Sequence, residues 1–233
     1  MIDLAAIVQS PAMARVAGVL AHLAARGLGT PAVASGFVRC HLLGVPPTDV
    51  DIHYVGGIPT ATAEAWLRDE VRQAGDAAGE WDIWNFTEHD PRITSTAYGY
   101  RVHFVSTIDC VYLGADGALH DLTGRGVADA DQRVLALTHL TVTDYPYTPG
   151  QLCYLYLEGC RRMYLYGLTP TSASATALRA HTGLWQAAQP ADRRYLRDRV
   201  RQKLTAEQRA QAQALYARYG WDAVFTPEDG ADV

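Results

Sequence analysis

Hydrophobic and polar positions along the first 140 residues follow two periodicities, one helical and one typical of strands. Residues 3–26 have a helical pattern that is interrupted at Ser10-Pro11, where serine suits an N-cap and proline suits the first helical position. Residues 36–43 also read as a helix. A further helix is predicted from Thr60 or Thr62 to about residue 73, because four apolar residues form one stripe there.

Between these helices lie short runs with the composition and alternation of β-strands. The predicted strands cover residues 31–34, 50–55, 81–86, 101–106, 108–113 and 118–122. Asp116-Gly117 is a strong hairpin signal between the last two of them. Strands mixed with helices in this way predict a mixed sheet with helices packed against it.

The pattern becomes helical from Gln151 onward, with breaks at Thr169-Pro170, at Gln189-Pro190 and before Thr205. A proline-rich segment at 143–149 separates the two parts. We therefore expect an α/β (α+β) head over residues 1–142 and a helical region over residues 150–233.

The composition and the missing motifs argue against several classes of enzyme and metal site. Lys203 is the only lysine among 20 basic residues, so a Schiff-base enzyme is disfavoured, and no Gly-x-x-x-x-Gly-Lys-Ser/Thr motif of a P-loop NTPase is present. No Gly-x-Ser-x-Gly elbow of a serine hydrolase occurs either. The four cysteines form no Cys-x-x-Cys pair, which disfavours structural zinc and redox chemistry.

No apolar run approaches the length of about 20 residues that spans a bilayer. The start Met1-Ile2-Asp3 lacks the basic region of a signal peptide. We expect a cytoplasmic protein without membrane contact.

Candidate chemistry centres on Asp49 and Asp51 at the start of the predicted strand 50–55. Side chains alternate along a strand, so these two carboxylates point to the same face, where their mutual repulsion favours a bound cation such as Mg²⁺. Upstream, Ser35-Gly36 opens a predicted helix whose N-terminal N–H groups suit phosphate oxygens. The alternative is a turn whose acids are merely solvated. His53 would share the carboxylates' face, either as a metal neighbour or as a histidine satisfied by nearby acids.

The stretch around these residues resembles the signature of nucleotidyltransferases in the polymerase-β-like superfamily, specifically CCA-adding enzymes and bacterial poly(A) polymerases. The resembling positions are Gly36, Val38, Arg39, Leu42, Leu43, Gly44, Pro47, Asp49 and Asp51. Further similarity lies in Thr107-Ile108-Asp109, in 116–121, and in Arg133-Val134-Leu135, while 161–181 is similar to the start of that family's helical neck. The similarity extends over about residues 30–185 and is specific in its first twenty.

The chain also departs from the family pattern. Ser35 stands where the family has the first of two glycines, and Cys40 follows the arginine where the family has an acid. The family's arginine-rich motif is replaced by His103-Phe104-Val105-Ser106, and Asp109 occupies an asparagine position. Base selection of the family's kind is therefore not expected.

The resemblance implies a nucleotidyltransferase that uses an NTP and two Mg²⁺ ions held by Asp49 and Asp51. Two-metal chemistry requires a third carboxylate on a neighbouring strand, for which Asp82 is the candidate, with Glu80, Asp90 and Asp109 as substitutes in that order. Ser35, Gly36 and Arg39 are expected to hold the triphosphate. Arg161 and Arg162 would complete the nucleotide pocket from the neck, or lie on a helix surface.

The acceptor is left open as a small molecule, a protein or an RNA end. Residues 186–218 carry eight basic and three acidic residues, whereas the whole chain has a net charge of −5. This segment is either the solvated face of a helix or the place where an anionic acceptor binds. The competing hypotheses are a non-catalytic nucleotide-binding or interaction module that keeps the fold, and a domain of a larger RNA-processing assembly.

Overall fold

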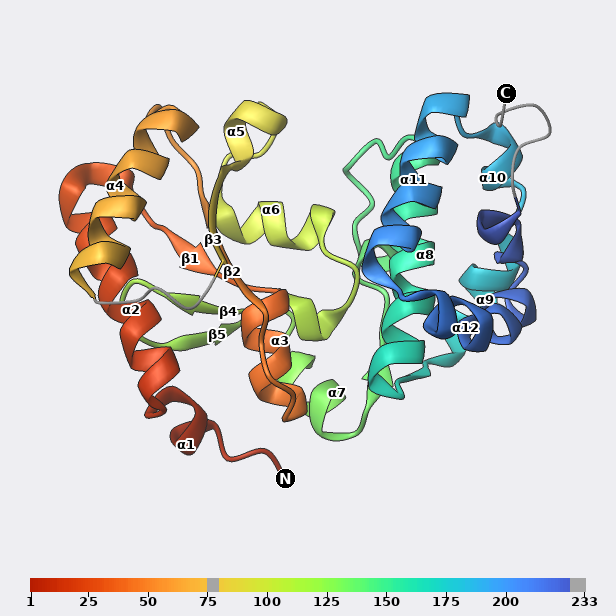
Figure 1. Cartoon of the computed structure of the whole chain (residues 1–233), viewed down its shortest axis with the longest axis horizontal. Coiled ribbons are helices and arrows are strands. Elements are labelled where there is room, and N and C mark those ends of the chain that lie inside the picture. Colours follow the sequence, from red (N-terminus) through yellow and green to blue (C-terminus); the bar gives the residue numbers. More distant parts are fainter. Residues whose placement is uncertain (75–79, 227–233) are drawn as a thin grey trace. The chain divides into compact units, whose positions relative to one another are not determined.

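The computed structural model divides into two compact units, Met1–Arg133 and Val134–Val233. It describes residues 1–74 and 80–226. The first unit combines a sheet with helices and the second is mainly helical (Figure 1). The predicted α+β class with a helical C-terminal region is confirmed. The division falls at Arg133–Val134, ahead of the proline-rich segment at 143–149.

A mixed five-stranded sheet forms the centre of the first unit. Its strands are β1 (Ala32–Val33), β2 (Asp49–Tyr54), β3 (Glu80–Asn85), β4 (Val111–Gly114) and β5 (Leu119–Asp121). Their order is β3-β2-β1-β4-β5; β2 and β3 run parallel, and the other neighbours are antiparallel. The hairpin between β4 and β5 turns at Asp116-Gly117 as predicted, with Gly117 at a φ of 73°.

Helices cover both faces of this sheet. They are α1 (Leu4–Val8), α2 (Pro11–Leu23), α3 (Gly36–Leu43), α4 (Thr60–Gln73), α5 (Phe86–His89), α6 (Thr96–His103) and α7 (Gly126–Asp131). Figure 1 shows α2 and α4 on one side of the sheet and α3 and α6 on the other. Ser10 caps α2 by accepting a hydrogen bond from the Met13 N–H, as the sequence predicts. The helix α4 begins after Pro59, which occupies the N-cap position instead of a threonine.

The strand predicted at 101–106 is wrong, because residues 101–103 form the end of α6 and residues 104–106 connect it to the next turn. Tyr98, Tyr100, Val102 and Phe104 alternate with other residues in a strand-like manner. Ser95 nevertheless caps a helix by accepting a hydrogen bond from the Tyr98 N–H, and the helix buries a stripe with helical spacing. The next prediction, 108–113, is right only in its second half, since Thr107–Cys110 forms a 3₁₀ turn before β4.

The described part of the second unit, residues 134–226, contains five α-helices. They are α8 (Pro149–Tyr166), α9 (Ser172–Ala180), α10 (Leu184–Ala187), α11 (Pro190–Lys203) and α12 (Ala206–Arg218), with 3₁₀ turns η3 (Thr138–Thr141) and η4 (Asp222–Phe225). The short strands β6 (Val134–Leu135) and β7 (Thr169–Pro170) pair in parallel. All three predicted helix breaks are confirmed. Among the helices described, none is long and apolar enough to cross a membrane.

The buried carboxylate of Glu158 in α8 lies close to three arginine side chains of this unit. Its oxygens lie 2.6 Å from Arg161 Nη2 and 3.4 Å from Arg199 Nε, and Arg162 Nη1 is 3.9 Å away. Burial by itself would raise the pKa of Glu158, but the guanidinium groups of Arg161 and Arg162 lower it to about 2. The carboxylate therefore stays ionised and links α8 to α11.

Two glycines give a matched test of packing in the first unit. A Cβ on Gly99 of α6 would lie 2.5 Å from Phe86 Cδ2, whereas one on Gly18 of α2 would meet no atom within 4 Å. We expect Gly99→Ala to lower the free energy of unfolding by about 1–3 kcal/mol through overpacking. Gly18→Ala should raise it by about 0.5–1 kcal/mol through helix propensity. Urea denaturation of both variants checks this, and equal effects would contradict the packing of α6 on Phe86.

The Glu158 cluster predicts a pH-dependent stability. Glu158→Gln should cost about 3–5 kcal/mol at pH 7, because it leaves buried guanidinium groups without their carboxylate. The folded pKa of Glu158 lies below its unfolded value, so the wild-type advantage is present above about pH 4.5 and shrinks as pH falls toward 2. Urea denaturation at pH 7 and pH 3 measures the difference. The control Glu207→Gln, at an exposed residue of α12, should leave the free energy of unfolding unchanged at both pH values. If wild type and Glu158→Gln differ in this free energy by the same amount at pH 7 and pH 3, the account is wrong.

Candidate functional site

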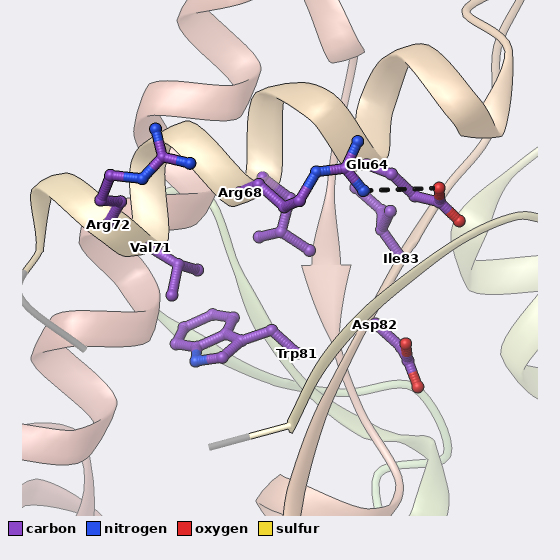
Figure 2. A pocket seen from close by; sticks show the side chains of 8 residues that line it. Glu64, Arg68, Val71, Arg72, Trp81, Asp82 and Ile83 are labelled. Atoms are coloured by element: carbon purple, nitrogen blue, oxygen red, sulfur yellow. Dashed lines mark ion pairs between the residues drawn. The ribbon is translucent and has the colours of Figure 1, made fainter. Parts of the chain in front are cut away.

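The predicted carboxylates lie on one face of neighbouring strands. Asp49 and Asp51 of β2 alternate with buried Val50, so both point away from the side on which α4 packs. In the parallel pairing of β2 with β3, Asp51 is the register partner of Asp82. Figure 2 shows Trp81 on the α4 side of β3 and the Asp82 carboxylate pointing away from α4. The strand register thus brings Asp82 to the face that carries Asp51.

Behind this face, between α4 and β3, is a groove with a volume of about 540 Å³. Its apolar lining comes from Leu67, Val71, Trp81 and Ile83, and Arg68 lies at its rim, 3.9 Å from Glu64 (Figure 2). Asp82 also lines the groove, but its carboxylate points away from α4, so the groove and the carboxylate face are distinct features (Figure 2).

The turn Ser35-Gly36 lies directly beside Asp49. A Cβ on Gly36 would come within 3.0 Å of Asp49 Oδ1, so glycine allows the start of α3 and the start of β2 to approach each other. The Ser35 side chain makes no capping bond to the first turn of α3. N–H groups at a helix N-terminus suit an anion, and here they adjoin the carboxylates.

Ser35 has a backbone conformation that disfavours a side chain. Its φ is 53° and its ψ is −114°, one of only two positive φ angles found at non-glycine residues in the described chain. Strain of this kind costs about 1–3 kcal/mol. Three contacts hold the residue there: its N–H donates to the Asp109 carbonyl at 3.4 Å, Arg39 Nη1 donates to its Oγ at 3.2 Å, and its Oγ donates to Asp109 Oδ1 at 3.5 Å.

Arg39 and Asp109 form a buried ion pair between Arg39 Nη1 and Asp109 Oδ1. Their side chains are 6% and 0% exposed. Asp109 also accepts hydrogen bonds from the Ser106 N–H at 3.0 Å and from Ser106 Oγ at 2.6 Å. Asp109, which the sequence suggests as a substitute metal ligand, instead fixes Arg39, the residue expected at the triphosphate.

His53 lies among aromatic rings on the same face as Asp51. Its ring stacks on Phe86 at 4.9 Å and meets Tyr100 and Phe104 edge-on, each at 5.4 Å. Burial, reinforced by the nearby His103, lowers the pKa of His53 to about 3. The imidazole is therefore neutral near pH 7 and acts as part of an aromatic layer.

The donor chemistry of Asp49 and Asp51 fits Mg²⁺, which prefers oxygen ligands and is commonly held by one or two carboxylates together with substrate phosphates. Both aspartates are partly exposed, so their face is accessible. Within residues 1–74 and 80–226, no three His, Cys, Asp or Glu side chains are close enough to hold a metal by themselves. Any ion here would require oxygens from a bound phosphate or from water.

Four predicted residues remain, two arginines and two acids. Arg161 and Arg162 belong to α8 in the second unit, where both face Glu158. Asp90 is buried and pairs with Arg92 at 2.7 Å. For Glu80 the structure describes the backbone, which is in register with Asp49, but not the side chain.

No family model and no curated protein matches this sequence. Solved structures do match its fold. A CCA-adding enzyme in complex with CTP has a TM-score of 0.65 at 17% identity, covering 97% of this chain and 57% of that one. A Thermotoga maritima CCA-adding enzyme complexed with tRNA has a TM-score of 0.63 at 18% identity, covering 97% of this chain and 56% of that one. A tRNA nucleotidyltransferase with a primer tRNA and an ATP analogue has a TM-score of 0.64 at 17% identity, covering 85% of this chain and 60% of that one.

This chain therefore has a nucleotidyltransferase-like fold that resembles the head domain of CCA-adding enzymes, as the sequence resemblance implies. It spans between 56% and 60% of the length of these three structures.

The strained turn yields a testable difference between two substitutions. Ser35→Gly and Ser35→Ala both remove the hydroxyl that contacts Arg39, but only glycine relieves the positive φ. We expect Ser35→Gly to be more stable than Ser35→Ala by about 1–3 kcal/mol, measured by urea denaturation. If the two variants unfold at the same urea concentration, Ser35 does not have the conformation described.

Proposed function

We propose that this protein is a Mg²⁺-dependent nucleotidyltransferase that transfers a nucleoside monophosphate from an NTP to an acceptor hydroxyl. The observation that carries the proposal is the juxtaposition of Asp49 with Gly36 at the N-terminus of α3. A metal-binding carboxylate and a phosphate-binding helix terminus then adjoin each other. The fold, which is shared with structures that contain CTP or an ATP analogue, supports the same class of reaction.

In this proposal the start of α3 holds the triphosphate. Backbone N–H groups after Ser35-Gly36 donate to phosphate oxygens, and Gly36 leaves room for them beside Asp49. Arg39 contributes mainly by fixing Ser35, because its guanidinium is engaged with Asp109. Arg161 and Arg162 would have to exchange Glu158 for a phosphate in order to join the nucleotide site.

Asp49 and Asp51 would hold two Mg²⁺ ions together with phosphate oxygens, and Asp82 would support the ion on the acceptor side through water, since the three carboxylates do not form a metal cluster by themselves. When bound, such ions lower the pKa of the acceptor hydroxyl and neutralise charge on the triphosphate. The acceptor oxygen forms a bond to the α-phosphorus, and the bond to the bridging oxygen breaks so that pyrophosphate leaves with the electron pair. The hydroxyl proton passes to a carboxylate of this face or to water.

The acceptor is a small molecule, a protein or an RNA end. Two of the matching structures contain tRNA, which supports RNA as one candidate. This chain covers 56% and 60% of those two structures, so each of them has parts that it does not match. Residues 186–218 supply the basic surface on which an RNA end would rest.

Loss of the paired carboxylates should abolish transfer. We expect Asp49→Ala and Asp51→Ala each to reduce incorporation of α-labelled NTP by about a thousandfold or more, since charge stabilisation at the reacting phosphate is lost. The assay incubates protein with each labelled NTP and Mg²⁺, with and without total small RNA, and asks whether label moves to RNA, to protein or to a small molecule.

A matched control is Asp69→Ala, which removes an acid from the exposed side of α4. It should transfer at the wild-type rate. Asp82→Ala tests the third carboxylate, and its transfer rate should lie between those of Asp69→Ala and of the Asp49→Ala and Asp51→Ala variants. A folded Asp51→Ala variant with full activity would refute the assignment, and NTP binding without any transfer by the wild type would favour the non-catalytic module.

A further inference from the structure

A small cleft in the second unit gathers three arginines between α11, α12 and η4. Its volume is about 250 Å³. Arg197, Arg201, Arg209 and Gln213 are among the residues that line it. No carboxylate lines it among the residues that the structure describes. The cleft is thus a strongly cationic concavity.

Helical spacing explains why these side chains converge. Arg197 and Arg201 are four residues apart on α11, so they project from the same face. Arg209 and Gln213 have the same spacing on α12. The buried side chains of Val200 and Val224 form an apolar floor between the two helices.

Two of the arginines are held in place by neutral groups. The guanidinium of Arg197 lies 5.1 Å from the ring centroid of Trp185, in cation–π geometry. Arg209 Nη1 donates to the carbonyl of Arg201, in the last turn of α11, at 3.0 Å and to that of Leu204, its C-cap, at 2.7 Å. These contacts help to fix the orientation of both side chains.

Donors remain for a ligand. The two hydrogen bonds of Arg209 use only Nη1, so Nε and Nη2 stay available among its five N–H donors. Arg201 is 56% exposed, and its Nη1 is 3.8 Å from Asp198 Oδ1. Exposed pairs of this kind contribute about 0–1 kcal/mol, so a dianion could readily replace the contact.

We propose that this cleft binds a phosphate group. Guanidinium forks match the oxygens of phosphate in bidentate geometry, and three positive charges suit a multiply charged anion better than a single carboxylate. The phosphate can come from a free phosphate compound or from the backbone of a nucleic-acid strand. The site lies entirely within the second unit and does not depend on the proposed nucleotidyl transfer.

The test measures binding of inorganic pyrophosphate by calorimetry, and of a fluorescent single-stranded RNA by anisotropy. Both are done in EDTA without NTP, so that Mg²⁺-dependent binding to Asp49 and Asp51 does not contribute. We expect Arg201→Gln and Arg209→Gln to weaken binding about tenfold or more. The control Arg194→Gln removes the same charge from an exposed position of α11 outside the cleft and should change binding less than twofold.

Because Arg209 also caps α11, Arg209→Lys is included with thermal denaturation of every variant. A lysine keeps the charge but loses the fork, so weaker binding at an unchanged melting temperature supports the site. If the cleft variants lose pyrophosphate binding, the ligand of the cleft is a free phosphate compound. If they lose only RNA binding, the ligand is the backbone of a nucleic-acid strand. If neither ligand binds, or if Arg194→Gln has the same effect as the cleft variants, the proposal is wrong. Because these assays contain EDTA and no NTP, their outcome is distinguishable from failure of the transferase hypothesis.

Discussion

The candidate site depends on the buried ion pair between Arg39 and Asp109. It joins the first turn of α3 to the 3₁₀ turn before β4, two segments 70 residues apart in the chain. The same carboxylate accepts two hydrogen bonds from Ser106, and the same guanidinium donates to Ser35. Removing one partner of such a pair typically costs about 3–5 kcal/mol. The ion pair and its hydrogen bonds to Ser35 therefore fix the turn beside Asp49, although serine disfavours this backbone conformation.

Local signals predicted much of this arrangement. Ser10-Pro11, the limits 36–43 and the Asp116-Gly117 turn depend on capping and turn chemistry within a few residues, and the structure confirms them. The shared face of Asp49 and Asp51 follows from strand alternation alone. The parallel register that aligns Asp51 with Asp82 is a long-range property, for which sequence analysis supplied only the requirement for a neighbouring carboxylate.

Other features could not be predicted because they depend on tertiary contacts. The alternation of aromatic residues at 98–104 resembles a strand, but Ser95 caps a helix there and Gly99 allows it to pack on Phe86. The partner of Arg39 is distant in sequence and was assigned to a different role. In the second unit the basic residues of α11 and α12 divide in a way that composition cannot reveal: Arg199 joins the structural cluster of Glu158, whereas Arg201 and Arg209 face a cleft.

The central claim is that the face formed by Gly36, Asp49 and Asp51 is a nucleotide site. A crystal structure with a non-hydrolysable NTP analogue and Mg²⁺ tests it most directly. The account predicts the triphosphate at the N-terminus of α3, with metal density in contact with both aspartates. A nucleotide bound elsewhere on the molecule, with neither aspartate in contact with metal, would contradict it.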